Sequence, residues 1–226
     1  MSASAAAGLT SARVRARMVE RLRALGVRDA RVLAAMSRIE RHRFVDQALA
    51  SRAYEDTALP LGFGQAISQP YTVARCAELA LAGAADPKAA TVLEVGTGCG
   101  YAAAVLSDLF GTVFSIERVR ALHEVARNNL RPLRIANLRL TFGDGMLGLP
   151  AESPFDAIVS TAAADAVPDA WIEQLAAGGV IVAPLGRDAQ VLTVLTKGAD
   201  GRLTRRQHEP VRFVPLLQGT VAPGSR

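Results

Sequence analysis

Three glycines that follow an apolar run constrain the fold of this chain more than any other feature. Residues 91–95 form the apolar run, and Gly96, Gly98 and Gly100 come directly after it. A second strand-like run then closes on the acid Glu117. Glycine lets the backbone approach a ligand closely and adopt dihedral angles that a side chain forbids. A glycine loop after one strand, with an acid after the next, is typical of a parallel sheet that binds a nucleotide-type cofactor at its strand ends.

The spacing of these glycines narrows the cofactor. The dinucleotide fingerprint requires glycine at its first, third and sixth positions, and the sixth position here is Tyr101. A glycine loop of this spacing, with Glu117 beyond it, favours S-adenosylmethionine (SAM) over a nicotinamide dinucleotide.

Strand-like and helix-like segments alternate from residue 91 onwards. The pattern predicts strands near 91–95, 112–116, 137–142, 155–160, 179–184 and 190–196, with helices near 100–109, 118–130 and 166–176. Alternation with short connections predicts an α/β fold, a doubly wound and mostly parallel Rossmann-like sheet. After the two glycines 178–179 no convincing helix follows, so we expect the sheet to end in antiparallel strands, with a turn at residues 197–201.

The first 90 residues predict a helical addition to this sheet. Apolar residues at helical spacing predict one helix from Ser11 to Leu25, a second after a capping Asp29, and a third from Pro70 to about Gly83. The segment 44–67 has no clean period, and its Gly-Phe-Gly at 62–64 indicates a loop. We expect a disordered segment 1–10, one domain over 11–217 (a helical, substrate-side section 11–90 and a Rossmann-like core 91–217) and a tail 218–226.

Polar or small residues follow four of the predicted strands, at the edge where such sheets bind ligands. Glu117 is suited to accept both ribose hydroxyls, and Asp144 to accept from the exocyclic amine of adenine. The small residues from Thr161 to Ala164 leave room for the reactive sulfonium and the substrate. The predicted cofactor-binding residues are Glu94, Gly96, Thr97, Gly98, Gly100, Glu117, Arg118, Asp144, Gly145 and Thr161.

Four blocks of this sequence resemble the protein-L-isoaspartate O-methyltransferase family. The glycine loop 92–101 is similar to the SAM loop of that family, and residues 114–118 are similar to its second strand. Residues 53–56 with 62–70 (GFGQAISQP) resemble its substrate-side motif, and residues 210–216 (PVRFVPL) its C-terminal block. The resemblance covers roughly residues 15–217. Phe63, Ala66 and Cys99 depart from the residues common in the family.

The resemblance implies an enzyme that transfers a methyl group from SAM to the α-carboxyl of L-isoaspartyl residues in damaged proteins. The ester then collapses to a succinimide, which can reopen as normal aspartate. Ser68 matches the active-site serine of the family, and Ile67, Gln69 and Val214 are expected to lie at the bound peptide.

Methyl transfer to an isoaspartyl α-carboxyl requires little acid–base catalysis from the enzyme. A carboxyl with a pKa of about 3.5 to 4 is already ionised at neutral pH, so no general base is needed. Positioning is needed instead, and a hydroxyl such as Ser68 is suited to orient the carboxylate. Ser68 also stands where a helix N-cap is expected, and the residues alone leave both roles open.

Composition leaves two alternative functions open. Residues 1–52 hold eleven arginines and four acidic residues, which admits a SAM-dependent RNA methyltransferase, with a small-molecule substrate as a further variant. The other alternative is a non-catalytic SAM-binding homologue.

The two cysteines, Cys76 and Cys99, have no metal-ligand or disulfide spacing. We expect a cytoplasmic monomer that holds no metal and binds neither nucleic acid nor membrane.

Overall fold

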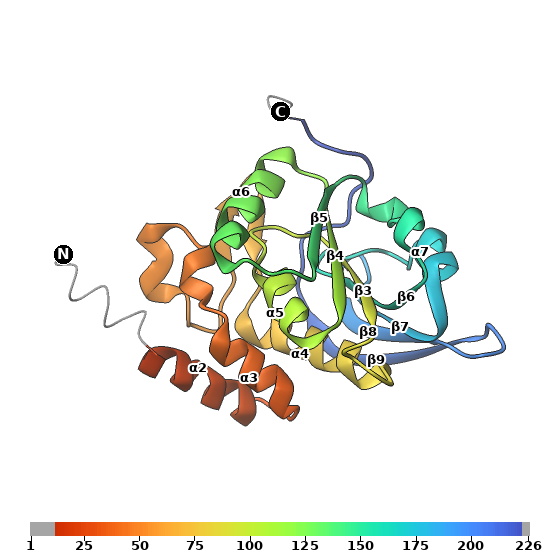
Figure 1. Ribbon diagram of the computed structural model, residues 1–226, viewed down its shortest axis with the longest axis horizontal. Coiled ribbons are helices and arrows are strands. Elements are labelled where there is room, and N and C mark those ends of the chain that lie inside the picture. Colours follow the sequence, from red (N-terminus) through yellow and green to blue (C-terminus); the bar gives the residue numbers. More distant parts are fainter. Residues whose placement is uncertain (1–11, 223–226) are drawn as a thin grey trace.

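A seven-stranded sheet forms the centre of the computed structural model, which describes residues 12–222 (Figure 1). Its strands are β3 (Thr91–Val95), β4 (Thr112–Glu117), β5 (Leu138–Phe142), β6 (Phe155–Ser160), β7 (Leu175–Leu185), β8 (Gln190–Lys197) and β9 (Leu203–Val211), in the spatial order β5-β4-β3-β6-β7-β8-β9. Strands β3 to β7 pair in parallel, and β8 and β9 complete the sheet as antiparallel strands. The predicted doubly wound sheet is confirmed.

Helices cover both faces of this sheet. Helices α4 (Pro70–Gly83), α5 (Tyr101–Leu109) and α6 (Arg120–Leu130) contact the sheet together with the larger apolar cluster, and α7 (Asp169–Gln174) packs with the smaller cluster around Trp171. In Figure 1, α6 and α7 lie on opposite sides of the strands. The chain moves outward from β3 to β5 and then returns to β6 beside β3. The strand order therefore reverses between β3 and β6, where a parallel sheet offers a ligand site.

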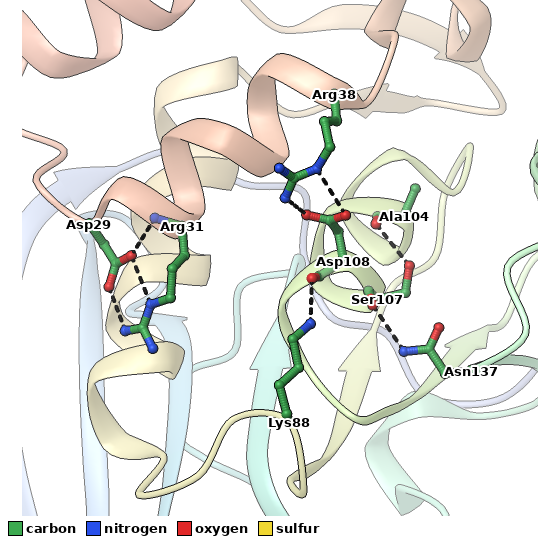
Figure 2. Close-up of polar contacts among 8 residues, drawn as sticks. All are labelled: Asp29, Arg31, Arg38, Lys88, Ala104, Ser107, Asp108 and Asn137. Carbon is green, nitrogen blue, oxygen red and sulfur yellow. Dashed lines mark hydrogen bonds and ion pairs between the residues drawn. The ribbon is translucent and has the colours of Figure 1, made fainter.

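The first two helices form an outer layer on α4 and α5. They are α2 (Ala12–Ala24) and α3 (Ala30–Arg38), and Asp29 caps α3 by accepting from the backbone N–H of Arg31 at 2.8 Å. Figure 2 shows that cap beside the contacts that fix α3 to α5, where the Arg38 guanidinium pairs with the Asp108 carboxylate. Lys88 donates to the Asp108 carbonyl at 2.7 Å.

A short hairpin lies within the segment that lacked a period in the sequence. Strands β1 (Leu59–Gly62) and β2 (Gln65–Ile67) pair antiparallel, after the 3₁₀ helices η1 (Arg41–Phe44) and η2 (Gln47–Arg52). The expected loop 62–64 is the turn of this hairpin, and Phe63 adopts a φ of 55° between two glycines. Strands β1 and β2 were not predicted from the sequence, because three or four residues are too few to establish an alternating pattern.

The predicted helix 166–176 was wrong in its extent. Helix α7 covers only Asp169–Gln174, because Pro168 begins it and Leu175 already belongs to β7. Strand β7 pairs with β6 first at Leu175 and again from Val180, with a register shift between them. Gly178 lies in this irregular stretch with a φ of 82°, which a residue with a side chain rarely adopts.

The remaining 3₁₀ turns are η3 (Arg131–Leu133), η4 (Gly145–Leu147) and η5 (Pro150–Glu152). After β9 the chain continues as an extended segment, residues 212–222, which we call the C-terminal strap. The strap runs past the carboxyl ends of β6 and β4. Its first part pairs with Ala163, which donates to the Val214 carbonyl at 2.8 Å. Its second part pairs with Val119 through Val221.

The predicted segment 1–10 lies outside the described residues. Within them, no helix is long and apolar enough to cross a membrane.

Candidate active site

A cavity of about 840 Å³, a volume that includes space open to solvent, lies where the strand order reverses. Loops that follow β3, β4 and β6 form its floor, and the β1–β2 hairpin, the start of α4 and the C-terminal strap form its walls. Of the predicted site residues, it is lined by Ile67, Ser68, Gly96, Thr97, Gly98, Glu117, Arg118, Gly145, Thr161 and Val214. Residues far apart in the sequence are thus brought together as expected.

The loop after β3 needs glycine for reasons that the structure makes explicit. Gly96 has a φ of 98°, and a Cβ there would lie 2.4 Å from the Thr161 hydroxyl. That hydroxyl donates to the Gly96 carbonyl at 2.6 Å, which joins the β3 and β6 loops. Gly100 does not line the cavity; it begins α5 with a φ of 90°, and a Cβ there would meet Leu130 at 2.7 Å. Gly96 therefore shapes the floor and Gly100 the packing behind it.

The Glu117 carboxylate is held at the cavity wall by backbone donors. The N–H groups of Gly98 and Val119 each donate to one of its oxygens at 2.8 Å. Glu117 is buried apart from a 5% exposed fraction. Each carboxylate oxygen retains a further lone pair, so the group is oriented and still able to accept hydroxyl donors from a ligand.

Glu94 lies beneath the floor and does not line the cavity. The Ser115 hydroxyl donates to its carboxyl and also lies 2.6 Å from the Thr97 hydroxyl. The other carboxyl oxygen has no hydrogen-bond partner among residues 12–222. Burial raises the pKa of Glu94 to about 8, and the nearby Glu117 charge acts in the same direction. Glu94 thus supports the loop from below through Ser115 and Thr97.

Arg118, Asp144 and Gly145 lie where the strap crosses the ends of β4 and β5. Both oxygens of Asp144 accept from backbone N–H groups, one from Met146 at 2.9 Å and one from Gly219 at 2.6 Å. Asp144 is not among the lining residues, whereas Gly145 is. Arg118 lines the cavity and donates to the Gly219 carbonyl at 2.8 Å. The observed partners of Asp144 are backbone groups of Met146 and of the strap. Its contact with adenine therefore stays a prediction.

Ser68 lines the cavity at the start of α4, and its hydroxyl makes no hydrogen bond within the described chain. Of the two roles that the sequence left open for Ser68, the structure excludes the helix N-cap, because Gln69 occupies that position. The cap is provided from a distance by Asp56, which accepts from the Tyr71 N–H at 2.8 Å. Ser68 is therefore not used by the helix end. Gln69 is exposed and does not line the cavity, so its contact with substrate stays a prediction.

Several lining residues were not predicted from the sequence. They are apolar or small for the most part and come from the hairpin, from α4 to α6 and from the strap: Leu61, Gln65, Ala66, Val73, Ala102, Leu122, Leu216 and Leu217. Leu216 lies within the family-like block 210–216, and Gln65 and Ala66 lie within the family-like block 62–70, so the resemblance was the available signal for these three positions. The others carry no chemical signature that distinguishes a cavity wall from a core.

The cavity fits SAM in the chemistry of its walls. The glycine loop exposes backbone to the ligand, Glu117 offers oriented acceptors for ribose hydroxyls, and apolar side chains such as Leu122 lie beside them. In residues 12–222 no group of three or more His, Cys, Asp or Glu side chains is placed to hold a metal ion.

The three histidines lie outside the cavity. His42 lies 2.7 Å from the Tyr54 hydroxyl, His208 lies 3.3 Å from the Arg75 guanidinium, and His123 packs against the Phe142 ring. Burial lowers the pKa of each of them. They therefore offer no general base to a ligand in the cavity.

Comparison with known proteins gives one consistent family. The family model described as protein-L-isoaspartate(D-aspartate) O-methyltransferase matches residues 13–221. A Burkholderia mallei relative named protein-L-isoaspartate O-methyltransferase is 58% identical over 220 residues, which cover 96% of this chain and 67% of the relative. One from Burkholderia thailandensis is 57% identical, over 96% of this chain and 66% of its own length. The chain thus spans about two thirds of the length of these relatives.

Solved structures agree in fold. A structure named protein-L-isoaspartate O-methyltransferase superposes with a TM-score of 0.80 at 32% identity, over 89% of this chain and 65% of that one. A Plasmodium falciparum protein described by the same activity, in complex with S-adenosyl-L-homocysteine, superposes with a TM-score of 0.79 over 90% of this chain and 98% of its own. At 24% identity the second likeness concerns the fold alone.

The resemblance noted in the sequence is thereby confirmed, and so is the fold that it implied. The family is one of methyltransferases, and the expectation of SAM as cofactor agrees with it. By the family match over most of its length and by the identity of its relatives, this chain belongs to the protein-L-isoaspartate(D-aspartate) O-methyltransferase family.

Proposed function

We propose that this chain transfers the methyl group of SAM to the α-carboxylate of L-isoaspartyl residues in damaged proteins and peptides, and so begins their repair through a succinimide. One observation carries the proposal. A single cavity joins the glycine loop and Glu117, which suit a nucleoside cofactor, to a serine hydroxyl that no protein group uses within residues 12–222.

The reaction needs an electrophile and an oriented carboxylate. Bound SAM supplies the electrophilic methyl group. The acceptor carboxylate is ionised at neutral pH, so it needs no proton acceptor, which agrees with a cavity that no histidine lines. Alignment of its oxygen with the methyl carbon is the remaining requirement, and positioning of this kind contributes up to about 7 to 11 kcal/mol.

Ser68 is suited to that task. Its hydroxyl donates to one oxygen of the carboxylate and leaves the other free to attack. Ile67 and Val214 line the same cavity. In this proposal they hold the peptide backbone around the isoaspartyl residue. Glu117, Gly96 and Gly98 hold the cofactor, while Glu94 acts through Ser115 and Thr97.

The RNA alternative has less support. Several arginines of the N-terminal helices form ion pairs with acids of the same protein: Arg15–Glu40, Arg23–Glu20, Arg31–Asp29, Arg38–Asp108 and Arg43–Glu40. Paired arginines are less available to phosphates. Small residues follow β6, where many methyltransferases of RNA bases carry a motif with an aromatic ring. A small-molecule acceptor would leave the strap residue Val214 without a peptide to contact.

A cytoplasmic monomer is the form in which we propose that the chain acts. The large apolar side chains that are most exposed, among them Leu25, Val125 and Leu147, are scattered over separate elements. Scattered apolar residues do not form an interface of the size that stable dimers bury. Both cysteines are buried and unpaired, which suits a reducing compartment.

A labelling experiment tests the proposal. The protein is incubated with methyl-labelled SAM and with matched peptides that differ only in an isoaspartyl or an aspartyl residue, with RNA as a third acceptor. Base-labile label on the isoaspartyl peptide alone supports the proposal. Label on RNA supports the alternative, and SAM binding without label on any acceptor supports a non-catalytic homologue.

A further inference from the structure

A cluster of charged and polar side chains links helix α4 to strand β9 outside the cavity. We call it the α4–β9 cluster, and its members are Tyr71, Arg75 and Glu78 of α4 with His208 and Glu209 of β9. None of the five lines the cavity, and the proposed function gives them no role. Helix α4 packs mainly on β6 and β7, whereas β9 is the edge strand two positions beyond β7. The cluster therefore connects the helix to a more distant part of the sheet.

The Glu209 carboxylate is the centre of this cluster. One of its oxygens, Oε1, accepts from the Arg75 Nε at 2.9 Å and from the Tyr71 hydroxyl at 3.3 Å. Burial and the Glu209 charge raise the pKa of Tyr71, so its hydroxyl stays protonated at neutral pH. Tyr71 and Arg75 are four residues apart, a spacing that places both on one face of a helix. A single carboxylate thus holds the first two turns of α4.

The ion pairs of the cluster are partly buried. The side chains of Arg75 and Glu209 are 22% and 26% exposed, and that of Glu78 is 12% exposed. Arg75 also donates to Glu78 at 2.7 Å, and its Nη2 lies 3.3 Å from the Nδ1 of His208. Glu78 in turn accepts from two backbone N–H groups of the turn between α2 and α3. Salt screens partly buried pairs less than exposed ones, so the guanidinium is held in the position from which it reaches Glu209.

The end of β9 and the start of the strap give Glu209 a fixed support. The Phe213 N–H donates to the Gln190 amide oxygen at 2.6 Å, and the Gln190 amide nitrogen donates to the Phe213 carbonyl at 3.1 Å. The next residue, Val214, is held through its carbonyl by the Ala163 N–H. Residues 214–217 line the cavity, and we call them the strap wall. Only four residues separate Glu209 from this wall.

The first turn of α4 is held at Tyr71 from two directions. Asp56 accepts from its backbone N–H at 2.8 Å, and Glu209 accepts from its hydroxyl. Ser68 lies three residues earlier and lines the cavity. We propose that Glu209 is a positioning residue for the methyl acceptor, because it holds the first turn of α4, and with it Ser68, at a fixed distance from the strap wall. The inference rests on the proposed function.

Glu209→Ala tests the inference on the whole chain. It is expected to lower kcat/KM for an isoaspartyl peptide by about tenfold, because the start of α4 then shifts relative to the strap wall and the carboxylate loses its alignment. The dissociation constant of SAM should stay near the wild-type value, since the glycine loop and Glu117 follow other strands. Glu209→Gln keeps an oxygen that accepts from both donors and should recover most of kcat/KM. Steady-state kinetics and calorimetry measure these quantities.

Tyr71→Phe removes one of the two donors and keeps the ring. It is expected to lower kcat/KM by about threefold, the effect of one hydrogen bond. Added to Glu209→Ala it should cause no further loss, because the hydroxyl acts through Glu209. Wild-type kcat/KM in Tyr71→Phe overturns the inference, which keeps it falsifiable if Glu209→Ala does not fold. Losses that simply add in the double variant overturn it as well.

Asp108 provides a matched control. Its side chain is 25% exposed, close to that of Glu209, and it pairs with Arg38 between α3 and α5, outside the cavity (Figure 2). Asp108→Ala is expected to lower the melting temperature and to retain wild-type kcat/KM, measured below the melting temperature of every variant. Equal losses of kcat/KM in Asp108→Ala and Glu209→Ala would reduce the effect to a general loss of stability and refute the positioning role.

The outcomes separate this inference from the function on which it rests. If the wild-type protein methylates no isoaspartyl peptide, the proposed function fails and the inference fails with it. If the wild type methylates the peptide and folded Glu209→Ala does so with the same kcat/KM, the function stands and the positioning role is refuted.

Discussion

The Ser68 hydroxyl lines the cavity and has no hydrogen-bond partner within the described residues, so it is free to donate to a bound carboxylate. Ser68→Ala is expected to lower kcat by about a hundredfold, the effect of a small misplacement of the reacting atoms. The dissociation constant of SAM is expected to stay near that of the wild type. Steady-state kinetics and calorimetry measure the two quantities.

Exposed Ser51 offers a matched control for this substitution. Ser51→Ala removes the same hydroxyl from η2, outside the cavity, and should change neither quantity. Wild-type turnover in Ser68→Ala would exclude the role assigned to the hydroxyl.

Glu94 makes the stability of the protein depend on pH. Burial raises its pKa from an ordinary value of 4.5 to about 8, so the folded state binds a proton more tightly than the unfolded state. This contribution is fully present below pH 4.5 and is lost as pH rises towards 8, at about 1.4 kcal/mol for each pKa unit of the difference.

Glu94→Gln removes the ionisation and keeps an acceptor for Ser115. Without added SAM, the melting temperature of this variant relative to the wild type is expected to rise between about pH 5 and pH 9, the range that brackets most of this titration. Thermal denaturation across that range measures it, with exposed Glu152→Gln as the control. A difference that stays constant with pH would contradict the raised pKa.

Single residues also mark where sequence reasoning succeeded and where it stopped. The position of Gly96 and Glu117 at the cavity was predicted from a local pattern, while their contact with the cofactor stays a prediction. The cap of α4 was not predicted, because Asp56 lies 15 residues before the N–H that it accepts from. Only the folded chain brings such a pair together.

At the scale of elements, the start of α4 carries Ser68 into the cavity and depends on this distant cap. Asp56→Ala removes the acceptor of the Tyr71 N–H and is expected to cost about 1 kcal/mol of unfolding free energy. Because the start of α4 then loosens, kcat/KM should fall as well. Urea denaturation and methylation kinetics measure the two effects.

Asp46 provides the comparison, because it accepts from the Ala48 N–H at 2.8 Å in η2, outside the cavity. Asp46→Ala should lower stability and leave kcat/KM unchanged. Equal losses of kcat/KM in both variants would show that the cap of α4 has no special connection to the site.

Elements with long periodic patterns were predicted well, and short ones were not. The 3.6-residue pattern of α6 and the apolar runs of β3 and β6 are decisive over their own length. The β1–β2 hairpin and the early start of β7 depend on pairing partners that a single segment does not reveal.

At the scale of the whole molecule, the strap joins the last described residues of the chain to the cofactor side of the cavity. Gly219 donates to Asp144, and the Val221 N–H donates to the Arg118 carbonyl at 2.8 Å. These contacts hold Leu216 and Leu217 against the cavity. Tertiary packing alone produces this arrangement, so the sequence could predict the block 210–216 by resemblance but not the path of residues 218–222.

A chain that ends after Leu217 tests this connection. The shortened chain loses several backbone hydrogen bonds of the strap, each of about 1 kcal/mol. We expect its dissociation constant for SAM to rise by about tenfold. Calorimetric titration with SAM measures it, and circular dichroism verifies that the shortened chain is folded. Wild-type affinity in a folded, shortened chain would show that the strap beyond Leu217 does not support the cofactor site.

The repair of isoaspartyl peptides is the most direct consequence of the proposed function. An isoaspartyl peptide is incubated with the protein and SAM in heavy-oxygen water, and the products are separated and weighed by mass spectrometry. The account predicts SAM-dependent formation of the aspartyl peptide with one heavy oxygen, because a succinimide is opened by water. An isoaspartyl peptide that stays unchanged and unlabelled, while the protein binds SAM, would contradict it.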